Sequence, residues 1–97
     1  MTLFGVPRWE KYADIVTFRS IEEAERAAEV LREEFMSAKT HAKKLRVWHV
    51  ADLAAKRAAA ASKKKNLKPE TRRRLIKVAK IYHKLADELH ALLYAGS

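Results

Sequence analysis

Apolar residues separated by three and four positions recur through residues 75–92, and this spacing constrains the fold more than any other feature of the chain. At 3.6 residues per turn, these positions fall on one face of an α-helix. They are Leu75, Val78, Tyr82, Leu85, Leu89 and Leu92. Pro69 suits the first turn of a helix, Glu70 complements the helix dipole, and Gly96 marks an end. The pattern therefore predicts a helix over residues 69–95.

An earlier segment predicts another helix, over about residues 20–36. Ser20 and Glu23 form a capping box, in which the serine hydroxyl accepts from the Glu23 amide and the Glu23 side chain reaches back to Ser20. The apolar stripe of this segment consists of Ile21, Ala24, Ala28, Leu31 and Phe35. The opposite face is acidic and carries Glu22, Glu25, Glu29 and Glu33.

Between these two segments, a further helix is predicted over about residues 40–62. Its apolar positions are Leu45, Trp48, Val50, Ala51, Leu53, Ala54, Ala58 and Ala61. Its C-terminal half, AAKRAAAAS, is mostly alanine, which favours the helix and lets a neighbouring helix approach closely. Lys63 to Lys65 then offset the negative end of the dipole, and residues 66–68 form a turn.

Residues 1–19 are expected to form an extended arm that includes Trp9 and Tyr12. Within the arm, residues 14–19, DIVTFR, alternate in part and allow one short strand as an alternative. A single strand is not stable alone, so it would pair with another strand, such as that of a second copy of the chain. The same segment could instead close one end of the helices. We therefore predict an all-α fold, a single helical domain over residues 1–97 that forms a three-helix antiparallel bundle with an N-terminal arm.

The composition excludes several classes of protein. The chain of 97 residues has no cysteine, so disulfides, thiolate nucleophiles and cysteine-bound zinc are ruled out. No run approaches the roughly 18 apolar residues of a membrane span, and the first residues do not resemble a secretory signal. We therefore expect a cytoplasmic protein that does not bind membranes. The lack of glutamine, the single asparagine and the many Lys, Arg and Glu residues are typical of a thermophile.

Positive charge is concentrated in one part of the chain, whose formal net charge is +9. Residues 56–84 carry twelve Lys or Arg and a single acid, Glu70, a net of +11 that leaves −2 for the remainder. Such asymmetry is typical of an anion-binding surface. The candidate nucleic-acid-binding residues are Lys56, Arg57, Lys63, Lys64, Lys65, Lys68, Arg72, Arg73, Arg74, Lys77, Lys80 and Lys84.

Four of these cations, Arg73, Lys77, Lys80 and Lys84, form a stripe separate from the apolar one. Solvated helix faces usually mix Glu with Lys, because like charges four residues apart repel. No acid occurs between Thr71 and Ala86, and a polyanion would relieve the repulsion. The arginines at the start of the helix gain nothing from its dipole, which favours an external anion over an internal role. A solvated face, an acidic protein and anionic lipid remain alternatives.

Residues 15–31, IVTFRSIEEAERAAEVL, resemble the opening of the ribbon-helix-helix family, an alternating strand followed by a capped acidic helix. The resemblance implies a DNA-binding homodimer in which Thr17 and Arg19, on paired strands, read the major groove. The glycine turn of that family is absent here.

Residues 50–54, VADLA, resemble the opening of the helix-turn-helix headpiece of LacI-type repressors, and residues 69–72, PETR, resemble a later run of it. This resemblance implies a turn near residues 55–57, where Ala, Lys and Arg replace the glycine and its apolar neighbour. The alanine-rich segment favours one unbroken helix instead.

Candidate catalytic and metal-binding residues are lacking. His41 and His49 are eight positions apart and His83 and His90 seven, whereas helical metal-ligand pairs are three or four apart. His83 and Asp87 suit an ion pair, with His90 three positions beyond. The serines lie at caps or ends, and no glycine-rich phosphate loop is present. We expect no enzyme activity, no metal and no cofactor.

The sequence therefore predicts a non-catalytic nucleic-acid-binding protein, DNA or RNA, that acts as an accessory, structural or ribonucleoprotein component. The alternative is a small interaction subunit that binds partner proteins through its acidic first helix and basic last helix. Trp48 is expected in the core, with stacking on a base as the alternative.

Overall fold

The computed structural model describes residues 18–95, which contain three α-helices: α2 (Ile21–Ser37), α3 (His41–Ser62) and α4 (Pro69–Ala95). The predicted bounds agree with these to within one residue. The predicted arm lies outside the described residues except for Phe18 and Arg19, which belong to no strand. Among the helices described, none has the length and apolar composition needed to cross a membrane.

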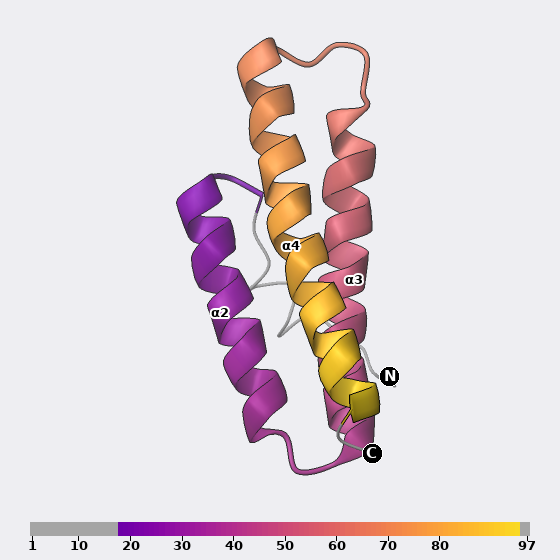
Figure 1. The fold of residues 1–97 in the computed structure, drawn as a ribbon. Helices are drawn as coiled ribbons and strands as arrows, with labels where there is room; N and C mark the ends of the chain where they lie inside the picture. The colour runs from indigo at the N-terminus through magenta and orange to yellow at the C-terminus, as the bar shows by residue number, and fades with distance from the viewer. Residues whose placement is uncertain (1–17, 96–97) are drawn as a thin grey trace, which may run out of the picture.

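The helices form an antiparallel bundle in which α2 and α4 run in the same direction and α3 runs against both (Figure 1). With 22 and 27 residues, α3 and α4 form a long hairpin, whereas α2 has 17 residues and lies beside only part of it. The end of the hairpin that carries the α3–α4 turn therefore extends beyond α2. The all-α bundle predicted from the sequence is confirmed for the described residues.

Side-chain caps fix where α2 and α3 begin. The Ser20 hydroxyl accepts a hydrogen bond from the Glu23 amide at 3.1 Å, and the Glu23 carboxylate lies 3.4 Å from the same hydroxyl. Thr40 Oγ1 accepts from the Lys43 amide at 3.2 Å at the start of α3. Each cap satisfies an amide that has no partner within its helix.

The core combines large side chains, mostly from α2 and α4, with alanines from α2 and α3. Its largest fully buried side chains are Tyr82, Phe35, Leu31, Leu85, Leu89, Val47 and Val78. Helix α3 contributes Ala51, Ala54, Ala55 and Ala58, all buried. Alanine lets two helix backbones approach closely, and α3 and α4 indeed share the most extensive contact of the bundle.

Two residues assigned to apolar stripes from the sequence lie at the surface. Leu92 is 38% exposed, and Leu93, four residues beyond the buried Leu89, packs in the core instead. Leu45 is 41% exposed because it lies two residues, about 200° of rotation, from the buried Val47. Alternating steps of three and four identify a helix face but leave its edge uncertain by one position.

An ion pair ties α2 to α4. Arg32 donates two hydrogen bonds to the Glu88 carboxylate, at 2.8 and 3.0 Å. The hydrogen bond with Glu88 raises the pKa of Arg32 above its ordinary value, although partial burial opposes this. A raised arginine pKa adds stability at every pH below the unfolded value, so this contribution does not vary near neutrality. Both side chains are partly exposed, which limits the pair to about 1 kcal/mol or less.

Leu89 and Leu92 form a matched pair for testing this packing. Leu89→Ala should lower the free energy of unfolding by about 2–5 kcal/mol, because it leaves a cavity in the core. Leu92→Ala should cost less than about 1 kcal/mol, because that side chain is at the surface. Chemical denaturation followed by circular dichroism measures both. Equal destabilisation at the two positions would contradict the observed face of α4.

Candidate nucleic-acid interface

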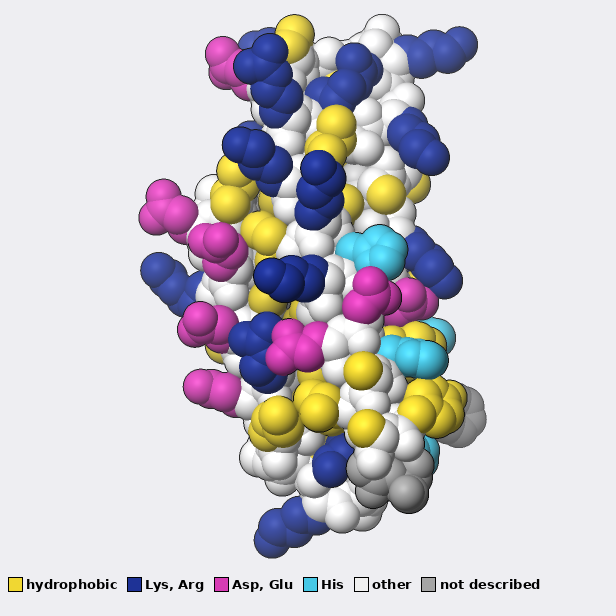
Figure 2. Space-filling model, in the orientation of Figure 1, with side chains coloured by type: hydrophobic (Ala, Val, Ile, Leu, Met, Phe, Trp, Pro, Cys, Tyr) yellow, Lys and Arg dark blue, Asp and Glu magenta, His cyan; other side chains and the backbone are white. Residues whose placement is uncertain are grey.

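The twelve candidate cations come from α3, the α3–α4 turn and α4. On the face shown in Figure 2, Lys and Arg dominate the end of the molecule that carries this turn, whereas Asp and Glu mix with them beside α2. Ten of the twelve are exposed, and Arg72 and Arg74 are half-buried. The structure thus brings the predicted cations together at the end of the hairpin that extends beyond α2.

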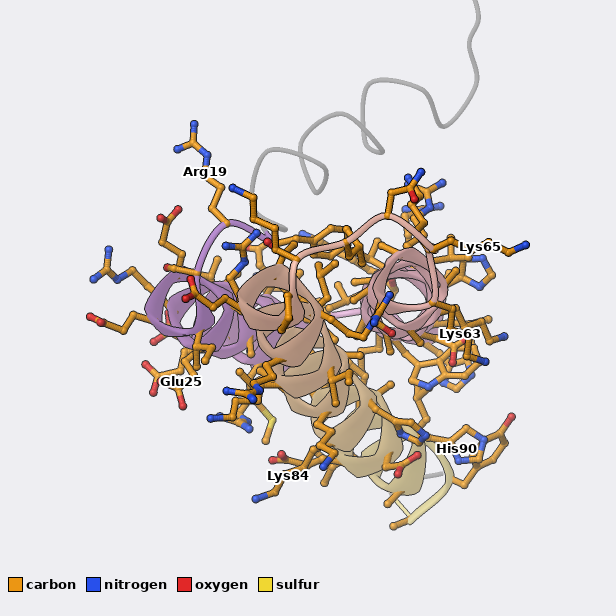
Figure 3. All side chains as sticks on the ribbon, turned by 90° about the horizontal axis from the view of Figure 1, so that it is seen from above. Arg19, Glu25, Lys63, Lys65, Lys84 and His90 are labelled. Atoms are coloured by element: carbon orange, nitrogen blue, oxygen red, sulfur yellow. The ribbon has the colours of Figure 1, made fainter. Side chains whose placement is uncertain are left out.

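The cations point outward in several directions rather than into one cleft. Seen from the turn end, Lys63 and Lys65 project from the α3 side of the molecule, and Lys84 projects from α4 on another side (Figure 3). A single small anion could contact only a few of them. An extended polyanion could follow the surface and contact many.

The basic stripe, Arg73, Lys77, Lys80 and Lys84, keeps its charge uncompensated. All four side chains are exposed, and no carboxylate within residues 18–95 lies at ion-pair distance from them. Lys56 differs, because its Nζ lies 3.0 Å from Asp52 Oδ2. The stripe is therefore available to an external anion, and so are the exposed Lys63, Lys64, Lys65 and Lys68, which likewise have no carboxylate at ion-pair distance within residues 18–95.

Arg72 has an internal role, contrary to the expectation from the helix dipole. Its Nε donates to the Ser62 carbonyl at 3.1 Å and its Nη2 to the Lys64 carbonyl at 2.7 Å. Carbonyls at the C-terminal end of a helix lack partners within that helix. Arg72 provides donors to two carbonyls there and thereby fixes the turn that carries the lysines. Sequence patterns gave no signal for this contact, which joins residues eight and ten positions apart.

Arg74 is also held partly inside the fold. Its Nε atom is buried and has no hydrogen-bond partner in the described part of the chain. An unsatisfied buried donor typically costs about 1–3 kcal/mol. Arg74 therefore contributes less accessible charge than the exposed stripe beside it.

A shallow groove of about 540 Å³ lies on the surface between α3 and α4, next to the basic stripe. Its floor is apolar and consists of Ala55, Ala59, Ile76 and Ala79. Lys80 and Lys84 also line it. Alanines on both helices, Ala55, Ala59 and Ala79, leave this depression because their side chains are small, and sequence reasoning did not identify it.

A row of rings lies at the other end of the hairpin, away from the turn. The His90 ring centroid is 5.6 Å from that of Trp48 and 4.6 Å from that of Tyr94. Trp48 is half-buried at the edge of the core, and Tyr94 is 65% exposed. Trp48 thus has features of both interpretations considered for it, a core contact and an accessible ring.

The histidines do not form a metal site within residues 18–95, where no group of three His, Cys, Asp or Glu side chains could hold an ion. His83 Nδ1 lies 3.3 Å from Asp87 Oδ2, which confirms the predicted pair. His90 turns instead toward Trp48 and Tyr94.

Neither resemblance to a DNA-binding family is reproduced in the described residues. Helix α3 is continuous from His41 to Ser62, so no helix-turn-helix break occurs near residues 55–57. The Phe18 ring packs edge-on against that of Tyr82, with 6.1 Å between the ring centroids. This contact supports the alternative in which the segment around Phe18 closes one end of the helices. The apolar face of α2 is buried within one chain, so burying it does not require a ribbon-helix-helix dimer.

Comparison with protein-family models, curated proteins and solved structures finds no match to this chain. Its function is therefore inferred from the geometry and charge of its own residues.

The role of Arg72 can be separated from that of its neighbour Arg73. Arg72→Ala should lower the free energy of unfolding by about 1–3 kcal/mol, because two carbonyls lose a charged donor. Arg73→Ala should change it by no more than about 0.5 kcal/mol, because the side chain is exposed. Thermal unfolding of both variants measures the two changes in stability. An Arg72→Ala protein as stable as wild type would show that the turn does not depend on this contact.

Proposed function

We propose that this protein binds nucleic acid through the basic surface around the α3–α4 turn and along α4, as a non-catalytic accessory, structural or ribonucleoprotein component. The observation that carries the proposal is the basic stripe, four exposed cations without a carboxylate partner in the described residues. Acidic residues are available in the same chain but are concentrated on α2, where they leave the stripe uncompensated.

The stripe costs stability unless an anion is bound. Like charges three or four residues apart on a helix each repel by a few tenths of a kcal/mol. A phosphate backbone replaces this repulsion with attraction and releases its condensed counterions. Binding of this kind is strong at low salt and falls steeply as salt rises.

The dimensions of the stripe suit a polymer rather than a single phosphate. From Arg73 to Lys84 the helix rises about 16 Å. Duplex DNA carries one negative charge per about 1.7 Å of its axis, so this length faces several phosphates. Lys63, Lys64, Lys65 and Lys68 extend the surface around the turn. Contacts of this type position a protein on the backbone and are tolerant of base sequence.

A second candidate function is that of a small interaction subunit in a larger assembly. It is favoured by the exposed acidic face of α2, where Met36 is 59% exposed and Val30 36%. A partner protein with a basic surface would pair with these acids and cover the two apolar side chains. This function predicts weak, non-specific affinity for nucleic acid and tight binding to a protein partner.

The quadruple variant Arg73→Gln, Lys77→Gln, Lys80→Gln and Lys84→Gln tests the proposal. It should fold, because these side chains are exposed, and it should bind nucleic acid more weakly than wild type. The slope of log K against log salt should flatten by about 0.9 for each duplex phosphate that the variant no longer neutralises, or by about 0.7 on single strands. Electrophoretic mobility shift at several salt concentrations, with duplex DNA, single strands and structured RNA, gives the slopes.

The matched control neutralises acids instead. The triple variant Glu22→Gln, Glu25→Gln and Glu29→Gln changes a similar number of exposed charges on α2, and its affinity should equal or exceed that of wild type. If the quadruple variant binds as tightly as wild type at every salt concentration, the basic stripe is only a solvated face. The interaction-subunit function would then be preferred.

A further inference from the structure

The groove between α3 and α4 lies beside the basic stripe and differs from it in chemistry. Its floor is apolar, and Ile76 within it is 41% exposed. Lys80 and Lys84 belong both to the stripe and to the lining of the groove. The surface therefore places a line of cations directly beside an apolar depression.

The row of rings continues the line of this groove. Asp52 and Asp87 line the groove on α3 and α4 respectively. Trp48 precedes Asp52 by four residues, and His90 follows Asp87 by three, so each ring lies about one helical turn farther along its helix. The contact between Trp48 and His90 joins the two helices at that point. Tyr94 extends the row by one more turn of α4.

Cations beside apolar and aromatic surfaces suit nucleotides whose bases are unpaired. Bases stack on aromatic rings irrespective of sequence, while the phosphates contact a neighbouring line of Lys and Arg. In a duplex, the base faces are covered by neighbouring base pairs and only the phosphates remain accessible. A duplex bound through its phosphates alone would leave the exposed rings without a stacking partner.

We propose that the groove and the ring row bind a single-stranded nucleic acid, with its phosphates on Lys80 and Lys84 and its bases on the groove floor, His90 and Tyr94. This inference rests on the proposed function and specifies the form of nucleic acid. From Lys80 to Tyr94, α4 rises about 21 Å. That length accommodates about six stacked nucleotides at about 3.4 Å each.

The two acids that line the groove are each bridged to a neighbour. Lys56 Nζ lies 3.0 Å from Asp52, and His83 Nδ1 lies 3.3 Å from Asp87. The Lys56 pair offsets the negative charge of Asp52, and the Asp87 carboxylate lies against the His83 ring. Carboxylates in the groove repel phosphates. We therefore place the phosphates on the Lys80 and Lys84 side of α4 and the bases on the side that faces α3.

Tyr94 is the residue at which to test the inference, because it is 65% exposed and its removal leaves the core intact. Tyr94→Ala should weaken binding to oligothymidylate and oligouridylate of about 12 nucleotides by roughly five- to 150-fold, the effect of removing one stacked base. Tyr94→Phe retains the ring and should bind nearly as wild type does. Binding to a duplex of the same length should be unchanged in both variants. Comparing the affinities for oligothymidylate and oligouridylate shows whether the protein prefers DNA or RNA.

A fluorescence measurement provides a second readout. The chain has two tryptophans, so the Trp9→Phe protein reports on Trp48 alone. Oligothymidylate should quench this emission in the parent protein and less so in Tyr94→Ala. Met36→Ala, which removes an exposed apolar side chain from α2, is the matched control and should change neither affinity nor quenching.

The outcomes distinguish this inference from the proposed function. If wild type prefers the duplex, or if Tyr94→Ala binds single strands as tightly as wild type, the single-strand inference is overturned while nucleic-acid binding stands. If no nucleic acid binds even at low salt, the proposed function fails and the inference fails with it. Wild-type preference for single strands, abolished in Tyr94→Ala and restored in Tyr94→Phe, supports both.

Discussion

The close approach of α3 to α4, with alanine on one helix and large side chains on the other, is the contact on which the rest of the structure depends. Ala51, Ala54 and Ala58 are almost fully buried against a helix that presents Val78, Tyr82 and other large residues. Because small side chains let the backbones approach, the two helices can pair along their length even where no third helix packs beside them. The hairpin can therefore extend beyond α2, and its surface near the turn is left with little apolar volume to cover.

The separation of charge follows from this geometry. Helix α2 carries most of its acids on its exposed face and lies beside the end of the hairpin away from the turn. The turn end has no such neighbour among the described helices, so its lysines and arginines are not neutralised by them (Figure 2). Arg72 differs from these exposed cations, because its guanidinium donates hydrogen bonds to the Ser62 and Lys64 carbonyls and thereby holds the turn in place. Arg72 thus stabilises the turn that carries Lys63, Lys64, Lys65 and Lys68.

Local signals allowed much of this to be predicted. The capping box at Ser20 and the helix-initiating Pro69 mark helix starts that depend on residues close in sequence, and the exposed stripe follows from helix periodicity alone. The contact of Arg72 with Ser62, the groove and the ring row could not be predicted in this way. They depend on how far α3 slides and rotates along α4, which is set by packing between residues distant in the chain. The exchange of Leu92 for Leu93 in the core has the same origin.

The central claim is that nucleic acid contacts the α3–α4 hairpin and not α2. Amide chemical-shift mapping of the ¹⁵N-labelled protein, during titration with a short oligothymidylate and with a duplex, locates the contact most directly. The account predicts shifts within residues 56–84 for either ligand. The single strand should add shifts at Trp48, Ala55, His90 and Tyr94. Shifts centred on α2, or none at low salt, would contradict it.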